Sequence, residues 1–133
     1  DETLEIAIIR LCFEAVAAVQ QGAVMLVLSD RILNQDDQPE GLPVHALLAT
    51  GAIHHALIEA GLRSEANLLV ETGTVLDAHD LAVLIGYGAT AVYPYLAYYS
   101  LRDMAARKDI DPGAATDALL YQYRKALEKG LYK

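Results

Sequence analysis

The sequence predicts an α/β fold: a three-layer α-β-α arrangement with a short parallel sheet of about three strands and helices on both faces. Two observations predict it. Short apolar runs of strand length alternate with segments whose apolar residues recur at three- and four-residue steps, as in amphipathic helices. Strands separated by helices need crossover connections, which make the sheet parallel and the connections right-handed. At 133 residues, the whole chain (1–133) is expected to form a single domain.

The first half of the chain is predicted to hold two helices and one strand. Apolar periodicity indicates a helix over residues 3–20, which Gly22 ends. The continuous apolar run 23–28 is typical of a strand that is buried on both faces. Residues 34–41 hold three acids, a proline and a glycine, and we expect a solvated loop there. A helix over residues 43–60 follows, since proline suits the first turn of a helix.

The second half continues the alternation. Asp77 is expected to cap the start of a short helix that Gly86 stops, and Gly130 to end the last helix. The other predicted elements are strands over residues 66–70 and 89–92 and helices over residues 94–108 and 111–130. A sheet of three strands has two exposed edges and little area for so many helices to cover. We therefore expect this incomplete α/β layer to pack against other protein segments.

Charge and hydropathy exclude several classes of partner. The formal net charge of −8 argues against nucleic acid and anionic membranes. No apolar run approaches the roughly 20 residues of a membrane span, and the first residues lack the features of a signal peptide. Residues 1–101 carry thirteen acids and three bases, whereas residues 102–133 carry five acids and seven bases. The basic end could pack against the acidic body or continue into something else.

A single cysteine, Cys12, excludes an internal disulfide framework and fits a reducing compartment, so we expect a cytoplasmic protein. Cys12 lies on an apolar helical face and is interpreted as a small core residue rather than a nucleophile.

Polar residues follow the predicted strands, and in parallel α/β sheets function gathers at these carboxyl ends. The turns 29–31 and 71–74 could hold an anion with backbone amides, but no phosphate-binding glycine motif is present. We therefore predict a structural strand-end network that consists of Asp30, Arg31, His55, Glu71 and His79. In it Asp30 and Arg31 hold their turn together, and His55 is a core histidine bonded to the backbone or to Glu71.

No catalytic, cofactor-binding or metal-binding residue is predicted on this chain. His54 and His55 are adjacent on a helix and point about 100° apart, which prevents them from sharing one ion comfortably. Asp77 and His79 are two positions apart, so their side chains also point in different directions. No nucleophile elbow supports a catalytic triad with serine or threonine.

Tyrosines cluster near the end of the chain and predict an interface, because tyrosine offers a large amphipathic contact area. The candidate interface residues are Tyr95, Tyr98, Tyr99, Tyr121 and Tyr123. A ring-stacking ligand site is the alternative. With an interface, the isolated chain is expected to form a homo-oligomer.

Four segments carry a family resemblance: "LVLSDR", "LPVHALLATGAIHHALIEAGLR", "NLLVETGTVLDAHDLAVLIGYGATAVYPYLAY" and "YRKALEKGLYK". Residues 11–133 resemble the C-terminal half of the central domain of the glutamate synthase large subunit. The resemblance implies a larger enzyme in which an amidotransferase domain releases ammonia from glutamine. A barrel domain with FMN and an iron–sulfur cluster then reduces the 2-iminoglutarate formed from 2-oxoglutarate.

By this resemblance the chain is a structural interdomain module that links the amidotransferase and FMN domains and helps to wall the ammonia path. It is not catalytic alone, since the nucleophilic cysteine, the flavin site and the cluster cysteines have no counterpart here. Departures from the family pattern fall at Val16, Ala56, the run 79–82 and Tyr99. Either the chain is an excised and re-engineered fragment, or a full-length parent has diverged. The alternative function is a self-associating α/β scaffold.

Overall fold

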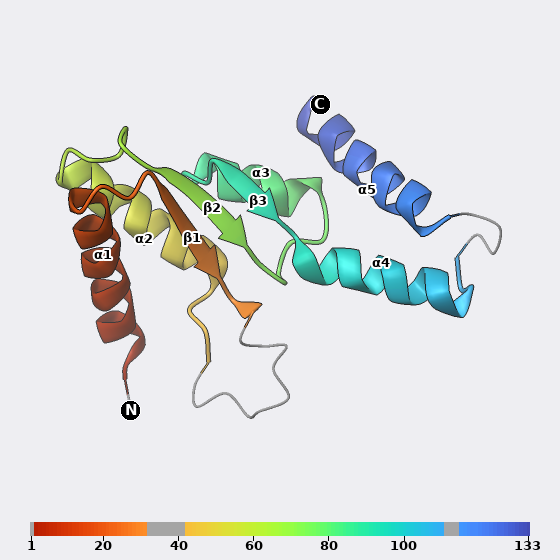
Figure 1. Ribbon diagram of the computed structural model, residues 1–133, viewed down its shortest axis with the longest axis horizontal. Coiled ribbons are helices and arrows are strands. Elements are labelled where there is room, and N and C mark those ends of the chain that lie inside the picture. The colour runs from red at the N-terminus through yellow and green to blue at the C-terminus, as the bar shows by residue number, and fades with distance from the viewer. Residues whose placement is uncertain (1, 32–41, 111–114) are drawn as a thin grey trace.

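The computed structural model describes residues 2–31, 42–110 and 115–133. Its elements, in chain order, are α1 (Leu4–Gln20), β1 (Met25–Ser29), α2 (Ala46–Glu59), β2 (Asn67–Glu71), α3 (Ala78–Gly86), β3 (Ala91–Tyr93), α4 (Tyr95–Arg107) and α5 (Thr116–Leu131) (Figure 1). The strands form one parallel sheet in the order β1-β2-β3. The predicted α/β class and three-stranded parallel sheet are confirmed. The predicted loop 34–41 and the predicted start of the last helix lie wholly or mostly outside the described residues.

Side chains at the helix starts fix where the helices begin. The Thr3 hydroxyl caps α1, and Asp77 caps α3 in a capping box with Asp80, as predicted for Asp77. Helix α2 begins later than predicted, because His45 caps it: its Nδ1 accepts a hydrogen bond from the Leu47 amide at 3.3 Å. The chain around Pro43 precedes the helix instead of forming its first turn.

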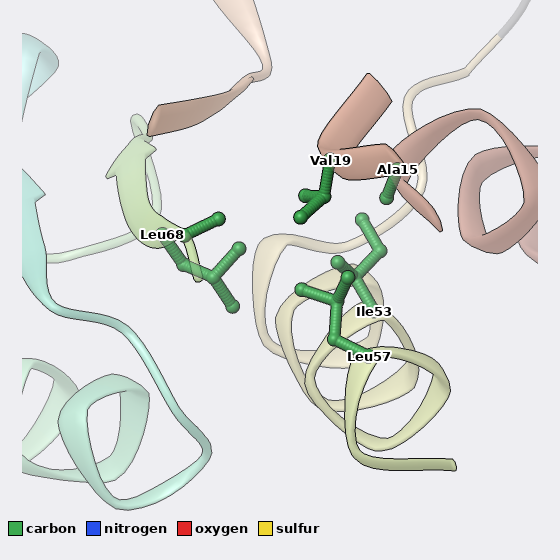
Figure 2. Packing of buried hydrophobic residues seen from close by; sticks show 6 residues of the cluster. Ala15, Val19, Ile53, Leu57 and Leu68 are labelled. Atoms are coloured by element: carbon green, nitrogen blue, oxygen red, sulfur yellow. The ribbon is translucent and has the colours of Figure 1, made fainter. Parts of the chain in front are cut away.

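One face of the sheet carries the core. Leu68 of β2 packs with Ala15 and Val19 of α1 and with Ile53 and Leu57 of α2 (Figure 2). A second cluster joins Val70 to residues of α3 and of the flanking turns, namely Val75, Leu84 and Ala89, and to Ala46 of α2. Cys12 was interpreted as a small core residue; it is partly buried and packs against the first cluster, at the margin of the core.

The opposite face of the sheet is largely solvent-exposed, with Leu69 and Glu71 partly buried, and we call it the open face. Because side chains alternate along each strand, it consists of Met25, Val27, Ser29, Asn67, Leu69, Glu71, Ala91 and Tyr93. Met25 is 57% exposed and Val27 is 55% exposed. Strand β1 was predicted to be buried on both faces, and this prediction is wrong.

Connectivity explains why the open face is bare. Two right-handed crossovers that proceed in one direction across a sheet place both of their helices on the same face. Helices α2 and α3 are these crossovers, and α1 packs beside α2 (Figure 1). The second helical layer that the sequence predicted is therefore not supplied to the open face by the described part of the chain.

Helix α5 docks on α3 through a close contact. A Cβ atom on Gly130 would lie 2.3 Å from the Cβ atom of Ala78, so only glycine allows this approach. The Tyr123 hydroxyl adds a hydrogen bond to the Leu76 carbonyl at 3.1 Å. Gly130 was predicted to end the last helix, but α5 continues to Leu131, and the glycine serves packing instead.

Candidate functional site

The strand register aligns the turns that follow the strands. Ser29 of β1 pairs with Glu71 of β2, which pairs with Tyr93 of β3. Beyond these pairs, the Asp30 amide donates to the Glu71 carbonyl at 3.2 Å, and the Thr72 amide donates to the Tyr93 carbonyl at 3.1 Å. The three turns singled out in the sequence thus meet at one edge of the sheet.

Asp30 is the buried centre of this edge. Its carboxylate accepts hydrogen bonds from the Gly73 amide at 3.0 and 3.2 Å and from the buried Thr72 hydroxyl. The Thr74 amide donates in turn to the Thr72 hydroxyl oxygen at 3.1 Å. Asp30 and Thr72 therefore occupy the Gly73 and Thr74 amides, the donors that an external anion would need at this turn.

Arg31 pairs with Glu71 and not with Asp30, so the predicted Asp30–Arg31 pairing is wrong. Its Nε lies 2.9 Å from Glu71 Oε1, and the Ser29 hydroxyl donates to Glu71 Oε2 at 2.7 Å. The guanidinium also lies over two aromatic rings, 5.3 Å from the centre of Tyr95 and 5.8 Å from that of Tyr93. The reason is the register, which places Glu71 directly beside Ser29.

Tyr95 belongs to this network and not to an interface. It is 1% exposed, and its hydroxyl donates to the Asp30 carbonyl at 3.4 Å. Burial, with Asp30 nearby, raises the pKa of the Tyr95 hydroxyl to about 12. The prediction that Tyr95 contributes to an interface is wrong, because its ring fills the space beneath the strand ends.

The other four candidate interface tyrosines lie on α4 and α5. Tyr99 and Tyr121 are exposed, whereas Tyr98 and Tyr123 are partly buried. The Tyr98 ring stacks on Tyr93 and meets the Tyr123 ring edge-on, with ring centres 5.6 Å apart in the second pair. Tyr98 and Tyr123 thus join β3, α4 and α5 to one another, and Tyr99 and Tyr121 remain candidates for contact with a partner.

Neither predicted histidine joins the strand-end network. His55 is exposed on α2, so its interpretation as a core histidine is wrong. Residues two positions apart on a helix point about 200° apart, and with Ile53 and Leu57 in the core His55 must face solvent. His79 is exposed at the start of α3 and lines a shallow pocket with His45 and Asp80.

His54 is the histidine with a structural role, and the sequence analysis missed it. The Arg63 guanidinium donates at 2.8 Å each to His54 Nδ1, to the Ala66 carbonyl and to the Gly88 carbonyl. Gly88 has a φ of +114°, and a Cβ atom on it would lie 2.4 Å from His54 Nδ1. Partial burial, the Arg63 charge and neighbouring His55 lower the pKa of His54. The available signal was Arg63, shortly after the end of the predicted helix.

A cavity of about 340 Å³ opens between α1, the end of β1 and the start of α2. Its charged lining residues already have partners among the described residues: Arg10 binds Glu2 and Glu14, and Glu71 binds Arg31. Within the same described ranges, no three histidine, cysteine or acidic side chains converge to hold a metal ion. None of the helices in these ranges is long and apolar enough to cross a membrane.

Comparison with known proteins gives one consistent result. Residues 1–133 match the family described as the glutamate synthase central domain. The chain is 37% identical over 127 residues to the glutamate synthase [NADH] of Schizosaccharomyces pombe, which covers 96% of this chain and 6% of that enzyme. It is 41% identical over 143 residues to a ferredoxin-dependent glutamate synthase 2 of Synechocystis, covering 98% of this chain and 9% of that enzyme.

A bacterial relative agrees. The glutamate synthase [NADPH] large chain of Bacillus subtilis is 35% identical over 135 residues, which cover 99% of this chain and 8% of that protein. The chain therefore spans less than a tenth of the length of these relatives.

Proposed function

Because the chain belongs to the glutamate synthase central domain family, we propose that it is a structural interdomain module of a glutamate synthase. In this role it links the amidotransferase and FMN domains and helps to wall the path of ammonia between them, and it catalyses no reaction alone. Glutamine and 2-oxoglutarate would be substrates of the whole enzyme, FMN and the iron–sulfur cluster would belong to its other domain, and we place it in the cytoplasm.

The state of the strand-end network carries this proposal. A ligand site in a parallel α/β sheet normally offers unpaired donors or acceptors at the carboxyl ends of the strands. Here Asp30 takes the Gly73 amide and the Thr72 hydroxyl, and Arg31 takes Glu71. Polar groups that bond to one another in this way rigidify the edge of the sheet. These groups are then not free to bind a ligand.

The proposal predicts how the isolated chain and a chimera behave. The isolated chain should neither release ammonia from glutamine nor bind FMN or phosphate; a saturable titration that Arg31→Ala abolishes would overturn this. In the chimera, the chain replaces the matching segment of the Synechocystis enzyme. Glutamine-dependent glutamate formation should persist, and uncoupled glutamine hydrolysis would contradict the linking role.

A self-associating scaffold is the second candidate function, and the exposure of Met25 and Val27 on the open face favours it. Light scattering after size exclusion, over a range of concentrations, measures the mass of the isolated chain. A stable dimer or larger assembly would support this candidate, and a monomer at every concentration would exclude it.

A further inference from the structure

The open face combines apolar side chains with very little net charge. Its middle row, which runs across all three strands, is Val27, Leu69 and Ala91, and Met25 extends it toward the start of β1. Its one charged residue, Glu71, is neutralised by Arg31 at the end of the strands. In a chain of net charge −8, the low net charge of this face favours apolar contact there.

A bare parallel sheet is unusual, because parallel sheets occur almost only with both faces covered. Covering the face needs little material. Three strands span two spacings of about 4.8 Å, or roughly 10 Å, which matches the diameter of one α-helix with its side chains. The dimensions of the open face therefore suit a single helix packed along the strands.

Two occupants compete for this position, and charge separates them. A second copy would bring another net charge of −8 against the first, which opposes association. A helix of the same polypeptide need not repeat this charge, and it arrives at a high effective concentration. The relatives leave ample chain for it, since the matched segment is only 6 to 9% of their length.

We propose that the open face is the seat of an amphipathic helix from the remaining polypeptide of a glutamate synthase, which completes the second layer of this α/β unit. The inference rests on the proposed interdomain role and identifies the open face as the surface that contacts the rest of the enzyme. The helix would present apolar residues at three- and four-residue steps to Val27, Leu69 and Ala91.

Methionine oxidation tests the proposal, because Met25 lies on the open face and the other methionine, Met104, lies on α4. Hydrogen peroxide is applied to the isolated chain and to the Synechocystis chimera, and mass spectrometry measures the oxidation rate of each methionine. Met25 is 57% exposed in the chain alone and should react readily. In the chimera we expect its rate to fall by about tenfold.

Substitutions provide an independent readout. Val27→Lys should leave the thermal unfolding of the isolated chain nearly unchanged but lower that of the chimera, because only there would the charge be buried. The matched control is Leu76→Lys, an exposed leucine outside the open face, which should affect both proteins alike. Equal effects of Val27→Lys in both proteins, or an unprotected Met25 in the chimera, would overturn the proposal.

The outcomes also separate this inference from the proposed function. A chimera with glutamine-dependent activity and an unprotected Met25 would overturn the helix on the open face but keep the interdomain role. A protected Met25 with uncoupled glutamine hydrolysis would keep the covered face and reject the role in ammonia transfer. Protection of Met25 in the isolated chain that rises with concentration, together with a doubled mass, would assign the face to a second copy instead.

Discussion

Asp30 shows how one buried acid can organise the end of a sheet. Its carboxylate is held by a backbone amide and a hydroxyl of the next turn, and its carbonyl receives the Tyr95 hydroxyl. Hydrogen bonds to a charged group contribute about 1.5–3 kcal/mol each, more than bonds between neutral groups. The Asp30 contacts therefore stabilise the junction of β1, β2 and α4 more than the same number of hydrogen bonds between neutral groups would.

Replacement of Thr72 by valine tests the hydrogen bond to Asp30. Thr72→Val keeps the shape of the buried side chain but removes a donor to the carboxylate and an acceptor of the Thr74 amide. We expect the free energy of unfolding to fall by about 2–3 kcal/mol, measured by chemical denaturation. The control is Thr116→Val, an exposed site on α5 where water can replace the hydroxyl. Equal losses at the two positions would show that burial of the Asp30 bond is irrelevant.

His54 should make stability depend on pH. Its pKa is lowered in the folded chain, so the unfolded chain binds more protons between the folded value and about 6.5. Stability from this group is then complete above pH 6.5 and is lost as the pH falls through the folded pKa. Protonation also removes the Nδ1 acceptor that Arg63 uses.

Thermal unfolding of the parent chain, His54→Gln and His55→Gln from pH 8 to pH 5 measures this effect. His54→Gln should flatten the decline below pH 6.5, because the amide oxygen accepts from Arg63 without titrating. His55→Gln, at an exposed site, should keep most of the decline, because burial and the Arg63 charge, the larger causes of the lowered His54 pKa, remain. An unchanged decline in His54→Gln would mean that another group is responsible.

At the scale of elements, the order of helices and strands could be read from the sequence, because periodicity and caps are local. The sidedness of β1 could not. Met25, Leu26, Val27 and Leu28 are all apolar, so their pattern does not distinguish a strand buried on both faces from one with an exposed apolar face. Only the order of the strands, with its same-sided crossovers, decides this.

The candidate site was predictable only in part, because the position of a residue along its strand is a local feature and its pairing across strands is not. Residues at strand ends could be chosen by position, and Asp30, Arg31 and Glu71 do meet there. Their partners could not be chosen, because pairing depends on strand register. The structural role of His54 was missed because its neighbours are distant in sequence: Arg63 follows it by 9 positions and Gly88 by 34. Arg63 donates to His54 and also to the Gly88 backbone carbonyl, a group that side-chain patterns do not reveal.

The α3–α5 contact yields a prediction for a helix pair. Gly130→Ala improves helix propensity by about 1 kcal/mol but adds a Cβ atom in contact with Ala78, so we expect net destabilisation. Ala78→Gly should relieve the clash. A double-mutant cycle, read by chemical denaturation, should therefore show a favourable coupling energy of about 1–2 kcal/mol. Additive effects would mean that α5 does not approach α3 this closely.

Across the whole molecule, acidic and basic residues are distributed unevenly, and the ion pairs of α4 and α5 form between residues close in sequence. Residues 1–101 carry thirteen acids and three bases, a net charge of −10. The ion pairs of α4 and α5 that the structure describes, Arg107–Asp103, Arg124–Glu128 and Lys125–Glu128, each lie within one helix. The basic end thus does not neutralise the acidic body through these pairs, and the body keeps its self-repulsion.

Salt should therefore stabilise the isolated chain. Raising the concentration of a monovalent salt from 0.01 to 1 M shortens the screening length from about 30 to about 3 Å, which weakens repulsion within the acidic body. Screening costs the exposed ion pairs about 0.3–0.5 kcal/mol each. We expect the relief of repulsion in the acidic body to outweigh this loss, so that the free energy of unfolding rises by a net amount on the order of 1 kcal/mol. Urea denaturation in NaCl and in KCl measures it, because the two salts share the screening but differ in cation. A fall in stability in both salts would show that the local pairs outweigh the repulsion of the body, and a rise in only one would indicate binding of that cation.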